Sequence, residues 1–223
     1  CVSSDSDFFV RFWGVRGSIA CPGPETTRFG GNTPCIEIRC GSRVLIFDAG
    51  TGLRHLGATL ASDGISDLDL FLSHTHIDHV VGFPFFCYLF KPENKLRVWS
   101  GHLDDGKTTE SVLRQLMAEP LFPVPVDIFT ADVSFHDFTA GDTLAPADGV
   151  TLRTTMLNHP QNATGYRVEF GGRSICYVTD TEHFEDGPDR NILGLIAGAD
   201  IVIYDSTFSD AEYPGFKGWG HST

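Results

Sequence analysis

The chain has 223 residues, of which 41% are hydrophobic and 20% are charged, which suits one α/β domain and excludes a disordered protein. Sixteen basic residues stand against 29 acidic ones, giving a formal net charge of −13, and such a chain repels nucleic-acid backbones unless a local basic patch offsets it. No run of Lys or Arg is visible, and every apolar stretch is shorter than the roughly 20 residues that span a bilayer. We therefore expect a cytoplasmic protein that acts on a small molecule. Neither a large nucleic acid nor a membrane is an expected partner, and a homodimer is an open alternative.

Strands are predicted where apolar and β-branched residues lie between turn residues. In chain order they are 8–13, 35–40, 43–48, 68–72, 96–100, 150–156, 165–170, 174–179 and 201–204. Gly41-Ser42 and Gly171-Gly172 are typical of two-residue hairpin turns. Helical spacing of apolar residues predicts helices over 53–61, 109–117 and 191–197. Many strands with interspersed helices favour two sheets packed face to face with helices outside.

Six cysteines are spread along the chain without a C-x-x-C pair, at Cys1, Cys21, Cys35, Cys40, Cys87 and Cys176. A domain of this size does not require a disulfide framework, so we expect reduced and mostly buried thiols. The chain begins at Cys1 rather than Met. A mature bacterial lipoprotein is an alternative explanation for such a start.

Four candidate metal ligands lie within six residues directly after the predicted strand 68–72, namely His74, His76, Asp78 and His79. Two imidazoles at i and i+2 on an extended segment point the same way, so His74 and His76 can share one metal ion. Asp78 and His79 follow as the chain turns and can face a second ion. A histidine-rich surface turn is the alternative, but this density of ligands after an apolar strand disfavours it. Carboxylate with imidazole suits Zn²⁺ first, with Mn²⁺ or Fe as alternatives.

The segment His74-Thr75-His76-Ile77-Asp78-His79 resembles the H-x-H-x-D-H signature of the metallo-β-lactamase superfamily. The resemblance extends to Asp48-Ala49-Gly50-Thr51-Gly52, Asn158-His159-Pro160, Val178-Thr179-Asp180-Thr181, Asp205-Ser206-Thr207-Phe208 and Gly220-His221-Ser222-Thr223. The last two segments resemble late motifs of the ribonuclease-Z-like branch, which usually carries Glu where this chain has Asp205. The resemblance implies a four-layer αββα fold, with residues 1–223 forming a single domain.

Roles for individual residues follow from the resemblance. The first metal would be held by His74, His76 and His159, the second by Asp78 and His79, and Asp180 would bridge the two. Two divalent cations about 3.5–4 Å apart acidify a shared water, and the resulting hydroxide would attack phosphorus or a carbonyl carbon. Asp78 is thereby assigned to catalysis as well as to metal binding. Taken alone, His159 and Asp180 would be ordinary loop residues; the upstream hexapeptide favours the ligand role.

His221 and Asp205 are the remaining catalytic candidates. By the resemblance, Asp205 would polarise His221, and His221 would protonate the leaving oxygen. The other histidines have no ligand context and are expected to be ordinary loop or surface residues: His55, His102, His136 and His183.

A glycine-rich segment, Arg28-Phe29-Gly30-Gly31-Asn32-Thr33, precedes the first predicted hairpin. Glycines beside Asn and Thr allow backbone amides to approach an anion closely. We predict a substrate-binding role for Gly31, Asn32 and Thr33, with a plain turn as the alternative.

Subgroups of the family differ at positions that the sequence can test. Class B β-lactamases carry Cys where Asp180 stands, and the diiron flavoproteins carry Glu where His76 stands, so neither activity is expected. The basic residues between the hexapeptide and His159 are scattered rather than grouped into a tRNA-gripping arm. We therefore predict a dinuclear metal-dependent phosphodiesterase acting on a small phosphodiester such as a cyclic nucleotide. A thioester hydrolase of glyoxalase II type and a non-catalytic metal-binding sensor or accessory protein are the alternatives.

A count of ligands adds one more expectation. The second metal would have only Asp78, His79 and Asp180, whereas the family places a further histidine downstream of the Gly-His-Ser-Thr motif. The sequence stops at Thr223. We expect the natural protein to continue with a strand, a helix and that histidine; the alternative is that His221 takes the open position.

Overall fold

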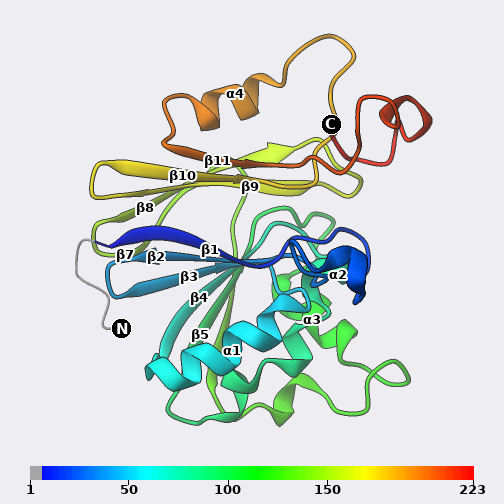
Figure 1. Cartoon of the computed structure of the whole chain (residues 1–223). Coiled ribbons are helices and arrows are strands. Elements are labelled where there is room, and N and C mark those ends of the chain that lie inside the picture. Colours follow the sequence, from blue (N-terminus) through cyan, green and yellow to red (C-terminus); the bar gives the residue numbers. More distant parts are fainter. Residues whose placement is uncertain (1–6) are drawn as a thin grey trace. The chain divides into compact units, whose positions relative to one another are not determined.

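The computed structural model describes residues 7–223 and divides them into two compact units. Of these described residues, the first unit comprises 7–100 and Asp104–Asp137, and the second comprises Gly101–Leu103 and Phe138–Thr223. Each is described by itself below (Figure 1). Cys1, and with it the lipoprotein alternative, lies outside the described residues. Within residues 7–223, no helix has the length and apolar character needed to cross a membrane.

A six-stranded mixed sheet forms the frame of the first unit, with strand order β1-β2-β3-β4-β5-β6. The strands are β1 (Phe8–Gly14), β2 (Cys35–Cys40), β3 (Arg43–Phe47), β4 (Asp67–Leu72), β5 (Lys95–Ser100) and β6 (Asp132–Asp137). β1, β2 and β3 pair antiparallel, whereas β3, β4, β5 and β6 pair parallel. The predicted hairpin at Gly41-Ser42 is the β2–β3 connection.

Helices cover one face of this sheet (Figure 1). They are α1 (Gly52–Asp63), α2 (Ile77–Val80) and α3 (Thr109–Leu116), with short 3-10 turns η1 (Pro24–Thr26), η2 (Phe83–Phe85), η3 (Cys87–Phe90) and η4 (Val126–Ile128). Leu53, Leu56 and Leu60 recur at helical spacing along α1 and are fully buried, because they pack against alternate apolar residues of the central strands. Gly64 ends α1 in the left-handed conformation that favours glycine.

The opposite face of the first sheet carries a row of stacked rings across neighbouring strands. Phe47 stacks on Phe71 at 5.5 Å between centroids, Phe71 on Trp99 at 5.8 Å, and Trp99 on His136 at 4.3 Å. Such cross-strand pairs stabilise a sheet and hold its register. This register matters because it sets where each strand ends, and the candidate ligands follow directly after those ends.

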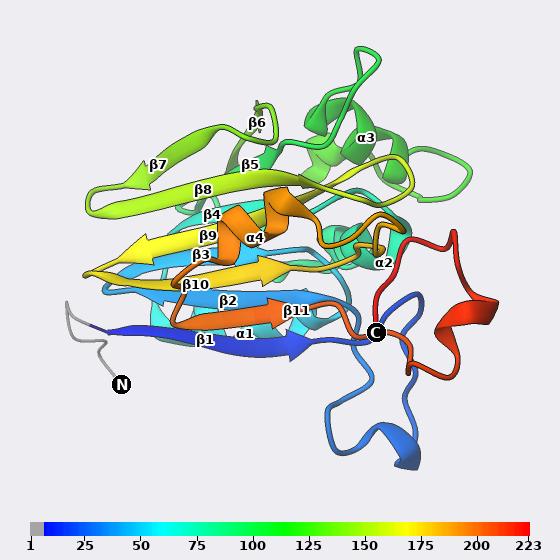
Figure 2. The same ribbon diagram turned by 90° about the horizontal axis from the view of Figure 1, so that it is seen from above.

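The second unit contains a five-stranded sheet with order β11-β10-β9-β8-β7 (Figure 2). Its strands are β7 (Thr143–Ala147), β8 (Val150–Leu157), β9 (Ala163–Phe170), β10 (Arg173–Val178) and β11 (Ile201–Tyr204), with helix α4 (Arg190–Ile196) and turn η5 (Tyr213–Gly215). Ile192 and Leu195 of α4 pack on Leu157 and Val178 of the sheet. Arg167 ties the helix to the sheet by donating to the carbonyls of Leu195 and Ala197, each at 2.9 Å.

Every predicted strand and helix is present, with ends that agree within two residues. Two strands and one helix were not predicted. β6 and β7 are edge strands, and Pro146 interrupts the β7 pattern, which only an edge position tolerates. α2 has only four residues, too few for helical periodicity to be detected. The cysteines described are free, and Cys35, Cys40 and Cys176 are buried, in agreement with the expected reduced thiols.

Candidate functional site

The candidate ligands of the first unit follow the carboxyl ends of two parallel strands. β3 and β4 pair in parallel, so both chains leave the sheet at the same edge. Asp48 follows β3 directly, and Ser73-His74 follows β4. Asp78 and His79 lie on the short helix α2, for which His76 is the N-terminal flanking residue. The predicted hexapeptide therefore begins as an extended segment and ends in a helical turn.

Three imidazoles gather at this edge. Nε2 of His74 lies 3.0 Å from Nδ1 of His76, and the ring centroids of His74 and His79 are 4.2 Å apart. His74 and His79 are each only 1% exposed. Buried imidazoles with ring nitrogens at such short separation are typical of metal ligands, because a shared cation removes the cost of burying their lone pairs together.

Asp48 and Ser73 orient this histidine cluster from behind. Oδ2 of Asp48 lies 2.9 Å from Nδ1 of His79. The Asp48 carboxylate also accepts hydrogen bonds from the Ser73 amide at 2.7 Å and from the Ser73 hydroxyl at 2.9 Å. The Ser73 hydroxyl in turn lies 3.0 Å from Nδ1 of His74. With Nδ1 held in this way, the His79 ring would ligate a metal ion through Nε2.

Asp78 is positioned by the loop that follows β1. Its Oδ2 accepts a hydrogen bond of 2.8 Å from the backbone amide of Ser18 and lies 3.5 Å from Nε2 of His79. Ser18 has a φ of 67° and Asp48 has a φ of 64°. Non-glycine residues seldom adopt this left-handed conformation, and strained examples cluster at functional sites. The sequence predicts no role for Ser18, and it includes Asp48 only as part of the family motif.

Close backbone packing holds the two ligand-bearing turns together. A Cβ at Gly82 would lie 2.0 Å from the carbonyl oxygen of Gly50, and one at Gly50 would lie 2.5 Å from that of Asp78. Only glycine fits at these two positions. The Asp48 turn and the Asp78 helix are therefore locked against each other by the residue type that permits such an approach.

The candidate ligands of the second unit also follow strand ends. β10 and β11 are parallel and end at the paired residues Val178 and Tyr204, so Asp180 and Asp205 leave the sheet at one edge. His159 follows β8. Nε2 of His159 lies 4.0 Å from Oδ1 of Asp180. Asp180 has a φ of 47° and accepts a hydrogen bond from the Thr179 hydroxyl.

His221 lies beside both carboxylates of this unit. Its Nδ1 is 3.0 Å from Oδ2 of Asp205 and 3.7 Å from Oδ1 of Asp180, and its ring contacts that of His159 with centroids 5.4 Å apart. Asp205 is itself held by the amide and hydroxyl of Thr207, at 3.0 and 2.7 Å. The predicted pairing of Asp205 with His221 is therefore present.

Glu182 organises the loop that carries His221. Its carboxylate accepts hydrogen bonds from the amides of Gly218 at 2.6 Å and of Gly220 at 2.8 Å. The Gly220 carbonyl lies 2.8 Å from Nδ1 of His159, which directs Nε2 of that ring away from the loop. Gly220 has a φ of +84°, and a Cβ there would lie 2.4 Å from the His159 ring. Sequence reasoning missed Glu182; its place two residues after Asp180 was the available signal.

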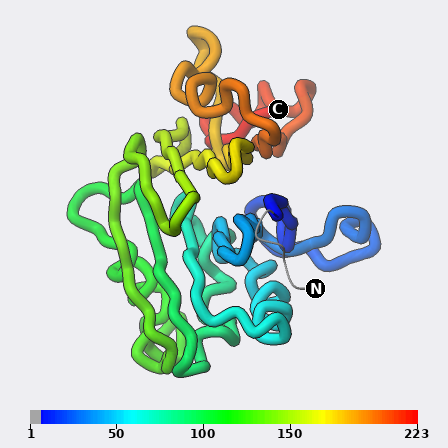
Figure 3. The backbone as a smooth tube through the Cα atoms, turned by 90° about the vertical axis from the view of Figure 1, so that its left-hand side faces the viewer, coloured from blue at the N-terminus to red at the C-terminus, as the bar shows by residue number. Residues whose placement is uncertain are grey.

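The predicted substrate segment lies in the first unit. Figures 2 and 3 show the loop between β1 and β2 (blue) extending away from the sheet to which it is attached. Gly31 and Asn32 line a cavity of about 390 Å³, whereas Thr33 is buried and exchanges hydrogen bonds with Thr51. The segment thus has two residues at a cavity and one that anchors the loop.

Two of the remaining histidines differ from the expectation of ordinary loop or surface positions. His136 lies on β6 against Trp99, and His102 is only 3% exposed. The expectation fails for these two residues because burial and neighbours along a sheet depend on tertiary packing, which a lone histidine in a sequence does not reveal. His55 is exposed on α1, as expected, and lines the same cavity. His183 is exposed, as expected.

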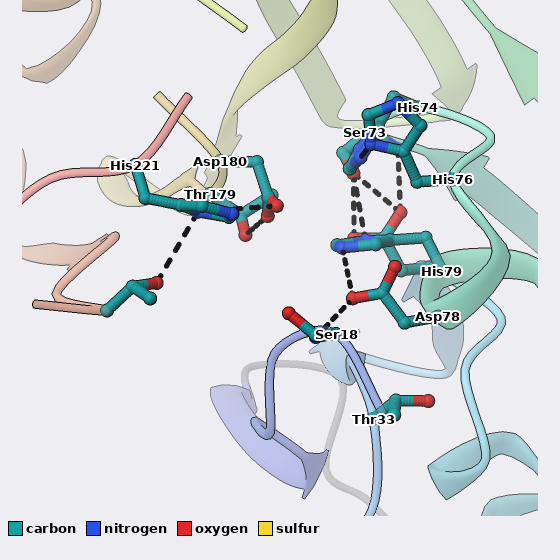
Figure 4. Close-up of polar contacts among 12 residues, drawn as sticks. Ser18, Thr33, Ser73, His74, His76, Asp78, His79, Thr179, Asp180 and His221 are labelled. Atoms are coloured by element: carbon teal, nitrogen blue, oxygen red, sulfur yellow. Dashed lines mark hydrogen bonds and ion pairs between the residues drawn. The ribbon is translucent and has the colours of Figure 1, made fainter. Parts of the chain in front are cut away.

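In each unit, the side chains that follow the strand ends are of the types that bind divalent metal ions (Figure 4). The first unit offers three imidazoles and a carboxylate, with His74 and His79 held from behind by Ser73 and Asp48. The second offers the His159 imidazole and the Asp180 carboxylate. Beside Asp180, the Thr181 hydroxyl is buried and has no hydrogen-bond partner among the described residues. Imidazole and carboxylate together suit zinc and related cations.

Comparison with known proteins identifies the family. The family model described as "Beta-lactamase superfamily domain" matches residues 43–223. The chain belongs to the metallo-β-lactamase superfamily. Ribonuclease Z of Haloarcula marismortui is 23% identical over 96% of this chain and 78% of its own length. Among solved structures, human tRNase Z, short form, matches with a TM-score of 0.66 and 20% identity over 96% of this chain and 84% of its own.

A diphosphatase of the PhnP family has the same fold, with a TM-score of 0.59 and 16% identity over 86% of this chain and 72% of its own. The predicted family, its ribonuclease-Z-like branch and its α/β fold class with two sheets and flanking helices are therefore confirmed. The chain is a member of a hydrolase superfamily.

One prediction from composition is wrong. We expected no large nucleic acid as partner, but the curated relatives that match nearly the whole chain are ribonucleases Z. The net charge of −13 is a sum over the whole chain, whereas a nucleic acid responds to the local field at the site. Arg16, Arg28 and Arg54 have no ion pair with a carboxylate among the described residues, and all three belong to the β1–β2 loop or the first turn of α1. The β1–β2 loop and the first turn of α1 therefore carry local positive charge that the net charge of the whole chain does not reveal.

Proposed function

We propose that this protein is a metal-dependent phosphodiesterase whose substrate contains nucleotides linked by phosphodiester bonds. The observation that carries the proposal is the orientation of two histidine rings. Nδ1 of His79 is held by Asp48, and Nδ1 of His159 is held by the Gly220 carbonyl, so each ring would ligate a metal ion through Nε2. The ribonuclease Z relatives support the choice of phosphodiester chemistry.

We propose as ligands of two divalent cations the six side chains already predicted, namely His74, His76, Asp78, His79, His159 and Asp180. Zinc is favoured because imidazoles outnumber carboxylates, and Mn²⁺ or Fe are the alternatives. Bound divalent cations would supply activation of water and stabilisation of charge on the phosphate oxygens. We also propose that the chain forms a single metallo-β-lactamase domain.

His221 would move the proton that the leaving oxygen needs. Because Nδ1 of His221 faces Asp205 at 3.0 Å, the carboxylate orients the ring, and Nε2 would be the atom that donates the proton. Asp205 acts through His221 as a positioning residue, since its other oxygen is occupied by Thr207. The role of the pair is thus general-acid catalysis.

The experiment is hydrolysis of bis(p-nitrophenyl) phosphate by the chelator-treated protein before and after addition of Zn²⁺ or Mn²⁺, with metal content measured by emission spectrometry. We expect activity only with metal, and its loss together with metal in Asp78→Ala. Asp132→Ala, at an exposed position on edge strand β6, is the control and should behave as the wild type.

Two results would overturn the proposal. Cleavage of S-lactoylglutathione without cleavage of phosphodiesters would favour a thioester hydrolase, and tight metal binding without turnover of either would favour a sensor. If phosphodiesters are cleaved, a panel of an RNA oligonucleotide, a dinucleotide and a cyclic nucleotide will identify the preferred substrate.

A further inference from the structure

The cavity of about 390 Å³ in the first unit is not explained by metal binding. Its wall combines the apolar side chains of Val81 and Phe85 with the polar side chains of Asn32, Thr51, Arg54 and His55. This volume lies within the range of about 300–1,000 Å³ that is typical of small-molecule sites.

The cavity lies close along the chain to residues that carry or hold a candidate metal ligand. Val81 and Gly82 follow directly after α2, the helix that carries Asp78 and His79. Ala20 lies two residues beyond Ser18, whose amide donates to Asp78. A substrate whose phosphodiester bound at the ligands of the first unit would therefore have a neighbouring group within reach of this cavity.

The polar side chains of the cavity are of the types that bind anions and nucleobases. Arg54 and His55 are exposed and have no side-chain hydrogen bond or ion pair among residues 7–223. In a chain with 29 acidic residues, an arginine that pairs with no carboxylate is available for an external anion. Asn32 is held at the wall through its Oδ1, which accepts a hydrogen bond of 3.1 Å from the Thr51 hydroxyl.

Phe85 supplies an aromatic surface. Its side chain is 57% exposed although it lies in η2, between the buried Phe83 and Phe86. Its ring touches Phe122 edge to face at 5.8 Å, which leaves ring surface for a further flat group. Aromatic rings beside arginine are the means by which proteins hold unpaired nucleobases, since every base has a π-face.

We propose that this cavity binds one nucleoside of the substrate, with its base on Phe85 and its phosphate at Arg54. The inference rests on the proposed phosphodiesterase function and adds the chemical class of the group beside the scissile bond. It assigns a role to the unpaired charge and the exposed ring together, which neither metal binding nor the fold requires.

The test measures binding without turnover. The full chain is freed of metal with a chelator and titrated calorimetrically with adenosine 5′-monophosphate and with ribose 5-phosphate. We expect the nucleotide to bind at least about tenfold more tightly, because only it carries a base. Phe85→Ala and Phe85→Leu should remove that difference, and Arg54→Gln should weaken both ligands.

Matched controls keep the result specific. Phe90→Ala removes another half-exposed ring, 48% exposed, outside the cavity, and Arg190→Gln removes an arginine on α4; both should retain wild-type affinities. Equal binding of the two ligands, or a Phe85→Leu protein that still prefers the nucleotide, would overturn the inference. If the protein hydrolyses phosphodiesters but binds the two ligands equally well, this inference fails and the proposed function stands. If it prefers the nucleotide but shows no metal-dependent hydrolysis, the proposed function fails.

Discussion

The carboxylate of Asp48 lies 2.9 Å from Nδ1 of His79 and also accepts two hydrogen bonds from Ser73. A fully buried carboxylate thus holds one histidine directly and, through a serine hydroxyl, a second one, His74. Because a ligand ring must present one particular nitrogen, the geometry of the histidine cluster depends on a residue outside the ligand set.

Asp48→Asn tests this dependence. The amide keeps the size of the side chain but removes the charge that orients His79, so we expect zinc affinity to fall by about tenfold or more. Competition with a chromophoric chelator measures the affinity, and a thermal melt checks folding. Asp132→Asn, an exposed carboxylate on β6, is the control. Unchanged affinity in a folded Asp48→Asn protein would show that Asp48 serves the fold only.

Glu182→Gln tests the anchor of the His221 loop. The neutral amide weakens the hydrogen bonds from Gly218 and Gly220, because a charged acceptor is about twice as strong as a neutral one. We expect faster hydrogen exchange at these two amides and a lower kcat, with little change in KM. Glu185→Gln removes an 85% exposed carboxylate that pairs with Lys217 and should change neither. Slow exchange in the Glu182 variant would contradict the anchoring role.

Gly220→Ala tests the close approach of the loop to His159. The new Cβ would meet the imidazole at 2.4 Å, and the φ of +84° disfavours any residue with a side chain. We expect the ring to be displaced, with at least about a tenfold loss of metal affinity. Gly215→Ala is the matched control, since nothing lies within 4 Å of its Cβ position. Similar metal affinity in the two variants would mean that the loop tolerates the displacement.

Asp69 gives the fold a pH dependence. Burial raises the pKa of its carboxyl to about 6, against the opposing effects of Arg43 and Trp99. The folded protein therefore binds this proton more tightly than the unfolded chain, whose Asp pKa is about 3.9. This contribution to stability is fully present below about pH 4 and is lost as the pH rises through about 6.

Urea unfolding at pH 5 and pH 7.5 measures this effect. From pH 5 to pH 7.5 the unfolding free energy of the wild type should fall by about 1 kcal/mol relative to that of Asp69→Asn, which cannot titrate. Parallel pH profiles for the two proteins would exclude the raised pKa. Asp132→Asn, an exposed carboxylate on edge strand β6 that is not among the causes of the raised pKa, is the control and should follow the wild-type profile.

The sequence by itself determined the family, the order of the central strands and helices, and the identity of the candidate ligands. It could do so because apolar periodicity decides which segments become strands and helices. A ligand cluster such as His74 to His79 is also contiguous in the chain and needs no tertiary contact to be recognised. Of the edge strands that escaped prediction, β7 is interrupted by Pro146, whereas β6 alternates Val133 and Phe135 with polar residues and was overlooked.

Only the tertiary structure decided which other residues support those ligands. Asp48, Ser18 and Glu182 act through backbone conformation and hydrogen bonds to residues far along the chain. The sequence places Asp48 in a family motif and Glu182 close to Asp180, but it does not show which groups these side chains contact. The same holds for the cavity beside Phe85 and for the arginines without carboxylate partners. Net charge misled the prediction about nucleic acids for this reason: pairing between charges is a property of three-dimensional neighbours, and a sum over the sequence discards it.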